Sequence, residues 1–150
     1  MQFDSIEEIL DFAIGKEMEA HDMYMDIAGK VKRPGLEKTF LELAQMELGH
    51  KARLEQVKAG DLSGFAAGEV QNLKISDHLV DVKPHPNMDY QEALLFAMKA
   101  EQRAHDLYVD LARATSDPGL RELFKGLAKE ELKHKLFFET EYDDVILEGN

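Results

Sequence analysis

The sequence contains no cysteine among its 150 residues. Disulfides, thiolate metal sites, iron-sulfur clusters and cysteine nucleophiles are therefore excluded. Proline is also scarce, with four residues, which leaves room for long helices. The chain has no apolar run of the ~18 residues that a membrane span needs, and its start lacks the basic and apolar regions of a signal peptide. We therefore expect a cytoplasmic protein without a membrane partner.

Basic residues are also fewer than acidic ones. The chain has 18 Lys and Arg against 30 Asp and Glu, a formal net charge of −12. Nucleic acid and anionic membranes would be repelled, so we expect neither as a main partner. With 44% hydrophobic and 32% charged residues, the composition is that of a soluble, folded protein. A single domain over residues 1–150 can bury a core without a structural metal, so a metal would serve chemistry.

The sequence repeats itself with an offset of 84 residues and no gaps, too extensively for chance. Each copy predicts two helices joined by a short turn. The matched positions include Glu17 with Glu101, His21 with His105, Tyr24 with Tyr108, Pro34 with Pro118, Glu47 with Glu131, and His50 with His134.

The ends of the helices can be placed from capping signals. Capping boxes, in which a short polar side chain and a glutamate satisfy free backbone N–H groups, start both copies. Pro34 and Pro118 suit the first position of the following helix, where a missing N–H costs nothing. The capping boxes are Ser5 with Glu8 and Asp89 with Glu92. The predicted segments are a helix pair over 5–59, a connection over 60–88, and a second helix pair over 89–142.

The connection is long enough to cross the whole bundle and leave the second and third helices parallel. The sequence therefore predicts an all-α fold, a ferritin-like antiparallel four-helix bundle with one long crossover. The connection itself is rich in Gly, Pro and Asp, and a short helix is possible over 69–80. We expect its histidines, His78 and His85, to face solvent.

Apolar residues at helical spacing define one inward face on each predicted helix. Each of these faces has one glutamate near its middle, and two faces add a histidine three residues later. The charged residues Lys129, Glu130 and Lys133 fall on outer faces, where we expect them to be solvated. The six polar residues that should meet in the core are Glu17, Glu47, His50, Glu101, Glu131 and His134.

Four carboxylates in a dry core would repel one another, and burying even one without a partner costs several kcal/mol. No Lys or Arg shares the inward positions. Protonation is one solution, but two divalent cations would balance four negative charges and bond each ligand atom. One Glu from each of two helices, with Glu-x-x-His from each of the others, is the di-iron or di-manganese constellation. Its oxygen and imidazole ligands suit iron or manganese; zinc would bind but is redox-silent.

A lone Glu-x-x-His is weak evidence, because this spacing arises often on solvated faces. Two copies in register, both in core phase, favour a dinuclear metal site over a metal-free helical interaction module. His21 and His105 lie at the edge of the inward face, so we expect boundary groups rather than ligands. Tyr24 and Tyr108 lie on the core face, either as plain core residues or bonded to a ligand carboxylate.

With these positions in place, the chain resembles the rubrerythrin family of the ferritin-like superfamily. The resemblance rests on KEMEAHDMY, MELGH, AEQRAHDLY and EELKH. It implies two irons that cycle between diferrous and diferric states while reducing hydrogen peroxide or dioxygen. By this similarity Glu17 and Glu101 would be terminal ligands, Glu47 and Glu131 would bridge the irons, and His50 and His134 would each complete one iron.

Two features depart from the family pattern. Typical rubrerythrins carry a rubredoxin domain with a four-cysteine iron, whereas this chain has no cysteine. Electrons are then expected from a separate donor, such as a rubredoxin-like protein. The family also tends to have a further glutamate three residues after the third-helix ligand. That position is Ala104 here, and its repeat mate is Ala20.

The expected function is a redox enzyme acting on peroxide or dioxygen, with Tyr24 and Tyr108 as candidate catalytic residues. The alternative is a ferroxidase or iron-handling protein that oxidises Fe(II) for sequestration or transfer. The resemblance implies a homodimer.

Overall fold

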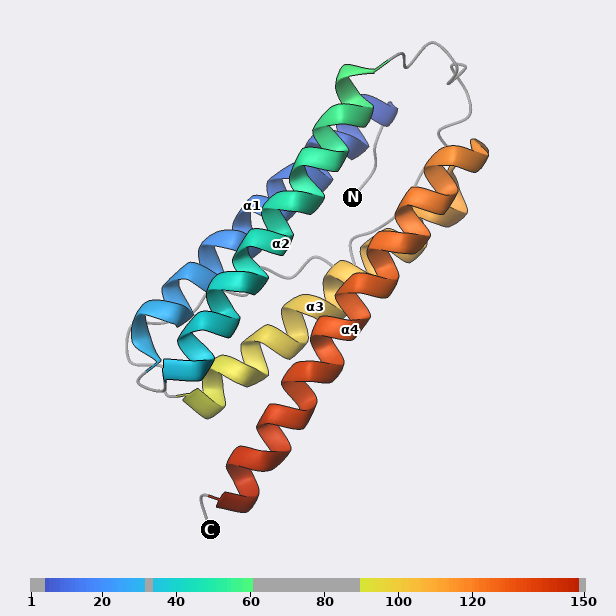
Figure 1. Cartoon of the computed structure of the whole chain (residues 1–150). Helices are drawn as coiled ribbons and strands as arrows, with labels where there is room; N and C mark the ends of the chain where they lie inside the picture. Colours follow the sequence, from blue (N-terminus) through green and yellow to red (C-terminus); the bar gives the residue numbers. More distant parts are fainter. Residues whose placement is uncertain (1–4, 32–33, 61–89, 149–150) are drawn as a thin grey trace.

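Four long helices make up the part of the chain that the computed structural model describes, residues 5–31, 34–60 and 90–148. Figure 1 shows them as two hairpins side by side. The helices are α1 (Ile6–Lys30), α2 (Pro34–Ala59), α3 (Tyr90–Ala114) and α4 (Pro118–Glu148). None of the helices in these ranges is long and apolar enough to cross a membrane.

The local signals act at the helix ends as expected. The Ser5 hydroxyl caps α1 by accepting a hydrogen bond from the backbone N–H of Glu8, at 3.1 Å. The prolines Pro34 and Pro118 are the first residues of α2 and α4. At the start of α4, the Asp117 carboxylate also accepts from the backbone N–H of Leu120, at 2.8 Å. This side chain acts as an N-cap that satisfies a backbone donor otherwise left free.

One predicted boundary was wrong. Helix α4 continues to Glu148 instead of ending near residue 142. The extra turns are anchored by Val145, which packs, partly buried, against the core. Three other expectations lie outside the described residues: the Asp89 cap, the short helix over 69–80, and the exposure of His78 and His85.

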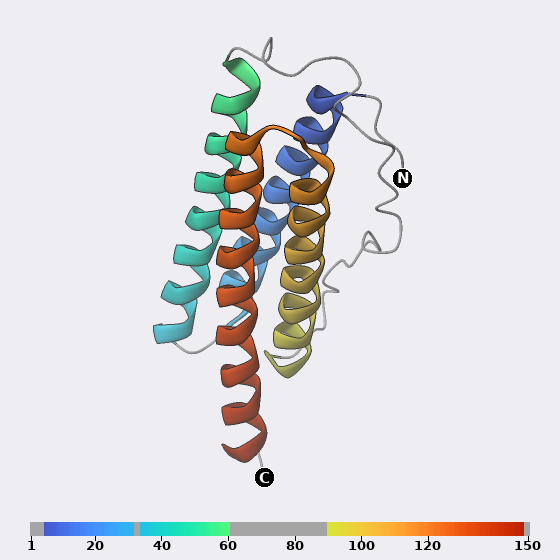
Figure 2. The ribbon, with the colours of Figure 1, turned by 90° about the vertical axis from the view of Figure 1, so that its right-hand side faces the viewer.

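The direction of the helices confirms the one-crossover bundle. Figures 1 and 2 show α1 antiparallel to α2 and α3 antiparallel to α4, whereas α2 and α3 run the same way. The main packing is within each hairpin, and α1 also packs against α3. Two parallel neighbours in sequence require a connection that returns along the bundle, as the crossover topology predicts.

The core has two apolar clusters with a polar layer between them. The first cluster lies toward the start of α1 and includes Leu10, Leu54, Leu111 and Phe124. The second lies toward the end of α1 and includes Ile27, Phe40, Leu94 and Phe138. Within the second cluster the rings of Phe40 and Phe138 stack, with 5.6 Å between their centroids. These two clusters shield the polar layer from water at both ends.

Candidate metal centre

All six polar residues expected in the core are buried there. Their exposed fractions are low enough to exclude bulk water from the charged atoms: Glu17 2%, Glu47 1%, His50 4%, Glu101 1%, Glu131 1% and His134 8%. Burying charge to this degree is tolerated only when the groups are neutralised or bound.

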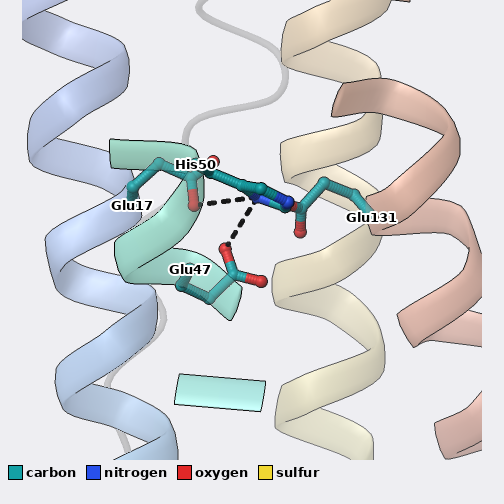
Figure 3. A group of neighbouring side chains, drawn as sticks. All are labelled: Glu17, Glu47, His50 and Glu131. Carbon is teal, nitrogen blue, oxygen red and sulfur yellow. Dashed lines mark ion pairs between the residues drawn. The ribbon is translucent and has the colours of Figure 1, made fainter. Parts of the chain in front are cut away.

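The helices converge on this layer from four sides. In α2, Glu47 and His50 lie three residues apart and so share one face. Figure 3 shows Glu17 of α1 and Glu131 of α4 reaching the same point as these two residues. On the other side of the layer, α3 contributes Glu101.

The six residues form two overlapping groups of four. Each residue in a group offers one ligand atom, and these atoms lie within 4.8 Å of one another. Glu47 and Glu131 belong to both groups. The groups are Glu17, Glu47, His50 and Glu131, and Glu47, Glu101, Glu131 and His134.

Both histidines direct the same ring nitrogen, Nδ1, toward the carboxylates. His50 Nδ1 lies 2.8 Å from Glu131 Oε1 and 3.4 Å from Glu17 Oε2. His134 Nδ1 lies 3.2 Å from Glu47 Oε1 and 3.5 Å from Glu101 Oε1. The two imidazole rings are nearly parallel, at an interplanar angle of 10° and a centroid distance of 6.3 Å. The first histidine therefore faces one group and the second faces the other.

One atom of every one of these six side chains is buried without a hydrogen-bonding partner among the described residues. The close contacts above lack the geometry of hydrogen bonds. The atoms are Oε2 of Glu17 and Glu101, Oε1 of Glu47 and Glu131, and Nδ1 of His50 and His134. An unsatisfied buried polar atom costs about 1–3 kcal/mol, more when charged. Six of them around one point fit a pair of cations, which would bond each atom.

The protonation of the site in the absence of cations follows from burial. Burial, followed by the neighbouring Glu47, raises the pKa of Glu17 to about 8. Burial also raises the pKa of Glu101 and of Glu131 well above the usual range. Burial lowers the pKa of His50, but the adjacent carboxylates of Glu131, Glu17 and Glu47 outweigh it and raise that pKa overall. The cation-free site therefore retains protons that bound metal would displace.

The two inward tyrosines bond to the carboxylates, so the second of the two alternatives is confirmed. The Tyr24 hydroxyl donates to Glu101 Oε1, and the Tyr108 hydroxyl donates to Glu17 Oε1. Each bond joins α1 to α3. Burial and the nearby glutamates raise the pKa of both phenols well above the usual range, so both remain neutral donors. Each tyrosine thus fixes the orientation of one glutamate.

Glu130 lies on an outer face with its side chain 43% exposed, as expected, but the sequence did not predict its contact with a buried histidine. Its carboxylate accepts a hydrogen bond from His50 Nε2, the ring nitrogen opposite the one that faces the buried carboxylates. The same oxygen lies 3.7 Å from Nη1 of Arg53. The repeat mate of Glu130 is Met46, whose side chain is half exposed and cannot accept in this way. His50 therefore has a carboxylate on the far side of its ring for which the repeat offers His134 no equivalent. In the sequence, the replacement of Glu130 by Met46 in the other copy was the sign of this difference.

His21 and His105 belong to neither group of ligand atoms. His21 Nδ1 lies 3.0 Å from Asp22 Oδ1 on the same helix. His105 Nδ1 donates to the backbone carbonyl of Ala128, at 2.9 Å. Both act as boundary groups in the described structure.

Comparisons with known proteins agree with this geometry. The profile of the rubrerythrin family matches residues 8–142. The chain belongs to the rubrerythrin family. Among curated proteins, none matches it.

Two solved structures resemble this rubrerythrin-family chain. A hypothetical protein from Pyrococcus furiosus is 26% identical, with a TM-score of 0.74, over 97% of this chain and 92% of that one. A protein from Thermotoga maritima, described as a ferritin-like diiron-carboxylate protein, is 20% identical with a TM-score of 0.77. That match covers 95% of each chain and shows a shared fold.

Proposed function

We propose that this rubrerythrin-family protein is a dinuclear iron-carboxylate redox protein that reduces hydrogen peroxide or dioxygen with electrons from a separate donor. The observation that carries the proposal is the pair of overlapping ligand groups that share Glu47 and Glu131. Two bound irons would supply the two electrons that, with two protons, convert peroxide to two waters. Manganese or zinc are possible substitutes, but zinc supplies no electrons.

Each side chain has a distinct task in this proposal. Glu17 and His50 would hold one ion, and Glu101 and His134 the other, with Glu47 and Glu131 between them. Tyr24 and Tyr108 hold the outer carboxylates in place and remain protonated, so each keeps a proton at its hydroxyl oxygen. The apolar clusters at both ends exclude water, which strengthens every charge interaction within the layer.

Oxidation of Fe(II) for storage or transfer is the second candidate. Ala104, half-buried, stands at the position where the family tends to have a further glutamate. Without that carboxylate, the centre has one ligand fewer for an iron that changes position between oxidation states. This difference from the family pattern is the reason to consider Fe(II) itself as the substrate.

Stopped-flow mixing of anaerobic, Fe(II)-loaded protein with peroxide and, separately, with dioxygen tests the proposal. We expect rapid oxidation by peroxide, slower oxidation by dioxygen, and repeated turnover when reductant is present. Glu55→Ala, at an exposed position on α2, is the control that should behave as wild type. Iron that oxidises once and then leaves the protein or accumulates would support iron handling. A diferrous protein inert toward both oxidants would refute the redox role.

A further inference from the structure

Four basic side chains gather in one groove between α3 and α4, although the chain as a whole is strongly acidic. The groove has a volume of about 470 Å³. Its floor is apolar, formed by Val109, Ala112 and Ala128, and His105 also lines it. The basic residues along it are Arg113, Arg121, Lys125 and Lys129.

The internal repeat shows that this charge is not a by-product of the fold. The equivalent positions of the first hairpin retain the small floor residues, with Ala28 for Ala112 and Ala44 for Ala128. None of the four basic positions is basic there. Their repeat mates are Gly29 for Arg113, Glu37 for Arg121, Leu41 for Lys125 and Gln45 for Lys129. The two hairpins thus share a core pattern but differ in charge at these positions, and among the residues that the structure describes the cationic groove lies on the second hairpin.

The side chains in the groove are available for a partner. Arg113, Lys125 and Lys129 are exposed. Within the described ranges, the ion pair of Lys125 is a long one, 3.8 Å to the exposed Glu122. An exposed pair of this kind contributes little and exchanges readily for another carboxylate. Arg121 is instead anchored, since its Nη2 donates to the backbone carbonyl of Thr115 at 2.9 Å.

The groove lies next to the candidate metal centre. His105 is four residues, about one helical turn, after Glu101 on α3. Ala128 is three residues before Glu131 on α4. The His105 imidazole bonds directly to the Ala128 carbonyl and so joins the two helices at this point. A protein bound over the groove would therefore lie close to the proposed irons.

We propose that this cationic groove docks an acidic face of the protein that supplies electrons to the metal centre. The inference rests on the proposed redox function. Arg121, Lys125 and Lys129 follow one another at four-residue spacing and span about 12 Å along α4. Such a row matches an extended acidic surface better than a single small anion. In a symmetric dimer whose two-fold axis passed through the groove, the groove would face itself and like charges would repel.

Charge complementarity also explains why the donor would bind at this groove. An acidic donor would be repelled by most of a surface with net charge −12 but attracted to the four basic side chains of the groove. Charges separated by more than about 8 Å are largely screened at physiological ionic strength, so the local row decides the approach. The groove thereby orients the donor toward the centre and raises the rate of encounter.

The test compares two double variants of the full-length, iron-loaded protein. Lys125→Glu with Lys129→Glu reverses two of the four positive charges in the groove and so cancels its net positive charge. Lys38→Glu with Lys58→Glu makes the same change in net charge on α2, outside the groove and at least eight residues along the helix from Glu47 and His50. The probe is reduced rubredoxin, a small acidic electron carrier, and the readout is the second-order rate of reduction of the oxidised centre. Equilibrium binding of the same probe is measured over a range of salt concentrations.

We expect the groove variant to lose about tenfold or more in reduction rate at low salt, and most of its salt dependence. The α2 variant should lose much less. Equal losses in both would overturn the proposal, because net charge alone would explain them. Dissociation of a wild-type dimer in the groove variant alone would also overturn it, by showing that a second copy occupies the groove.

Failure of the docking proposal and failure of the redox function can be told apart. If the centre exchanges no electrons even with dithionite and peroxide, the redox function fails. Binding of rubredoxin that depends on the groove lysines would still support the docking surface. If the centre is redox-active with small reagents but rubredoxin reacts equally with both variants, the docking surface fails and the redox function stands.

Discussion

Without metal, the protein should become less stable as pH rises through neutrality. Burial and Glu47 raise the pKa of Glu17 from 4.5 to about 8. A raised folded-state pKa means that the folded protein holds a proton that the unfolded chain releases, so stability is present at low pH and lost as pH rises. The raised pKa values of His50, Glu101 and Glu131 act in the same direction.

The contribution of Glu17 to this loss of stability can be calculated by itself. Integrating the linkage between about pH 5.5 and about pH 8.5, with pKa values of 4.5 unfolded and about 8 folded, gives a loss of about 3 kcal/mol. Starting at about pH 5.5 avoids the acid range in which surface carboxylates titrate. Bound cations should abolish the trend, because they replace the protons and bind more tightly as pH rises.

Urea denaturation of chelator-treated protein, followed by circular dichroism at several pH values in this range, measures the effect. The same series on Mn(II)-loaded protein provides the comparison. Glu17→Gln, which carries no charge at any pH, should reduce the loss over this range by the share of Glu17, about 3 kcal/mol, and leave the share of the other raised groups. Glu55→Gln, on an exposed side chain, should leave the slope unchanged. A metal-free protein whose free energy of unfolding is constant or rises over this range would refute the assignment of buried, proton-holding carboxylates.

Three further predictions concern single residues. Glu47→Ala, and likewise Glu131→Ala, should lose most of the bound metal while helicity survives; unchanged iron content in both variants would contradict the bridging role. Tyr24→Phe leaves a buried carboxylate short of one donor and should cost about 1–3 kcal/mol in urea denaturation of the metal-loaded protein, so no change would contradict the observed bond. Glu130→Gln should weaken metal binding by about 10- to 100-fold at one of the two positions in calorimetric titrations. Met46→Gln, at the repeat mate of Glu130, should not weaken it. Equal effects of the two substitutions would show that the Glu130 carboxylate, which bonds to His50, has no special role.

The sequence was sufficient to predict the features that depend on spacing along one helix. Glu47 and His50 share the period of their apolar neighbours, so their inward direction follows from the order of residues alone. The internal repeat then placed the equivalent groups of the other hairpin. Pro34 and Ser5 marked helix starts because their preferences are local.

Features that depend on how helices approach one another could not be predicted in this way. Spacing placed Tyr24 in the core but could not show that its hydroxyl meets Glu101 on α3. The contact between Glu130 and His50 depends on the separation of α2 and α4, and a half-exposed glutamate between two charged neighbours looks solvated in sequence. The last turns of α4 begin with Asp143 and Asp144, which interrupt the apolar pattern, and the packing of Val145 is a tertiary contact.

The central claim is that six buried side chains are stable together because two cations bind among them. Anaerobic titration of chelator-treated protein with Fe(II), followed by Mössbauer spectroscopy of the loaded sample, tests this most directly. We predict saturation at two irons per chain, with two distinguishable ferrous sites, because the carboxylate of Glu130 backs only one histidine. A protein that takes up neither Fe(II) nor Mn(II) at this site, while its fold remains intact, would contradict the claim.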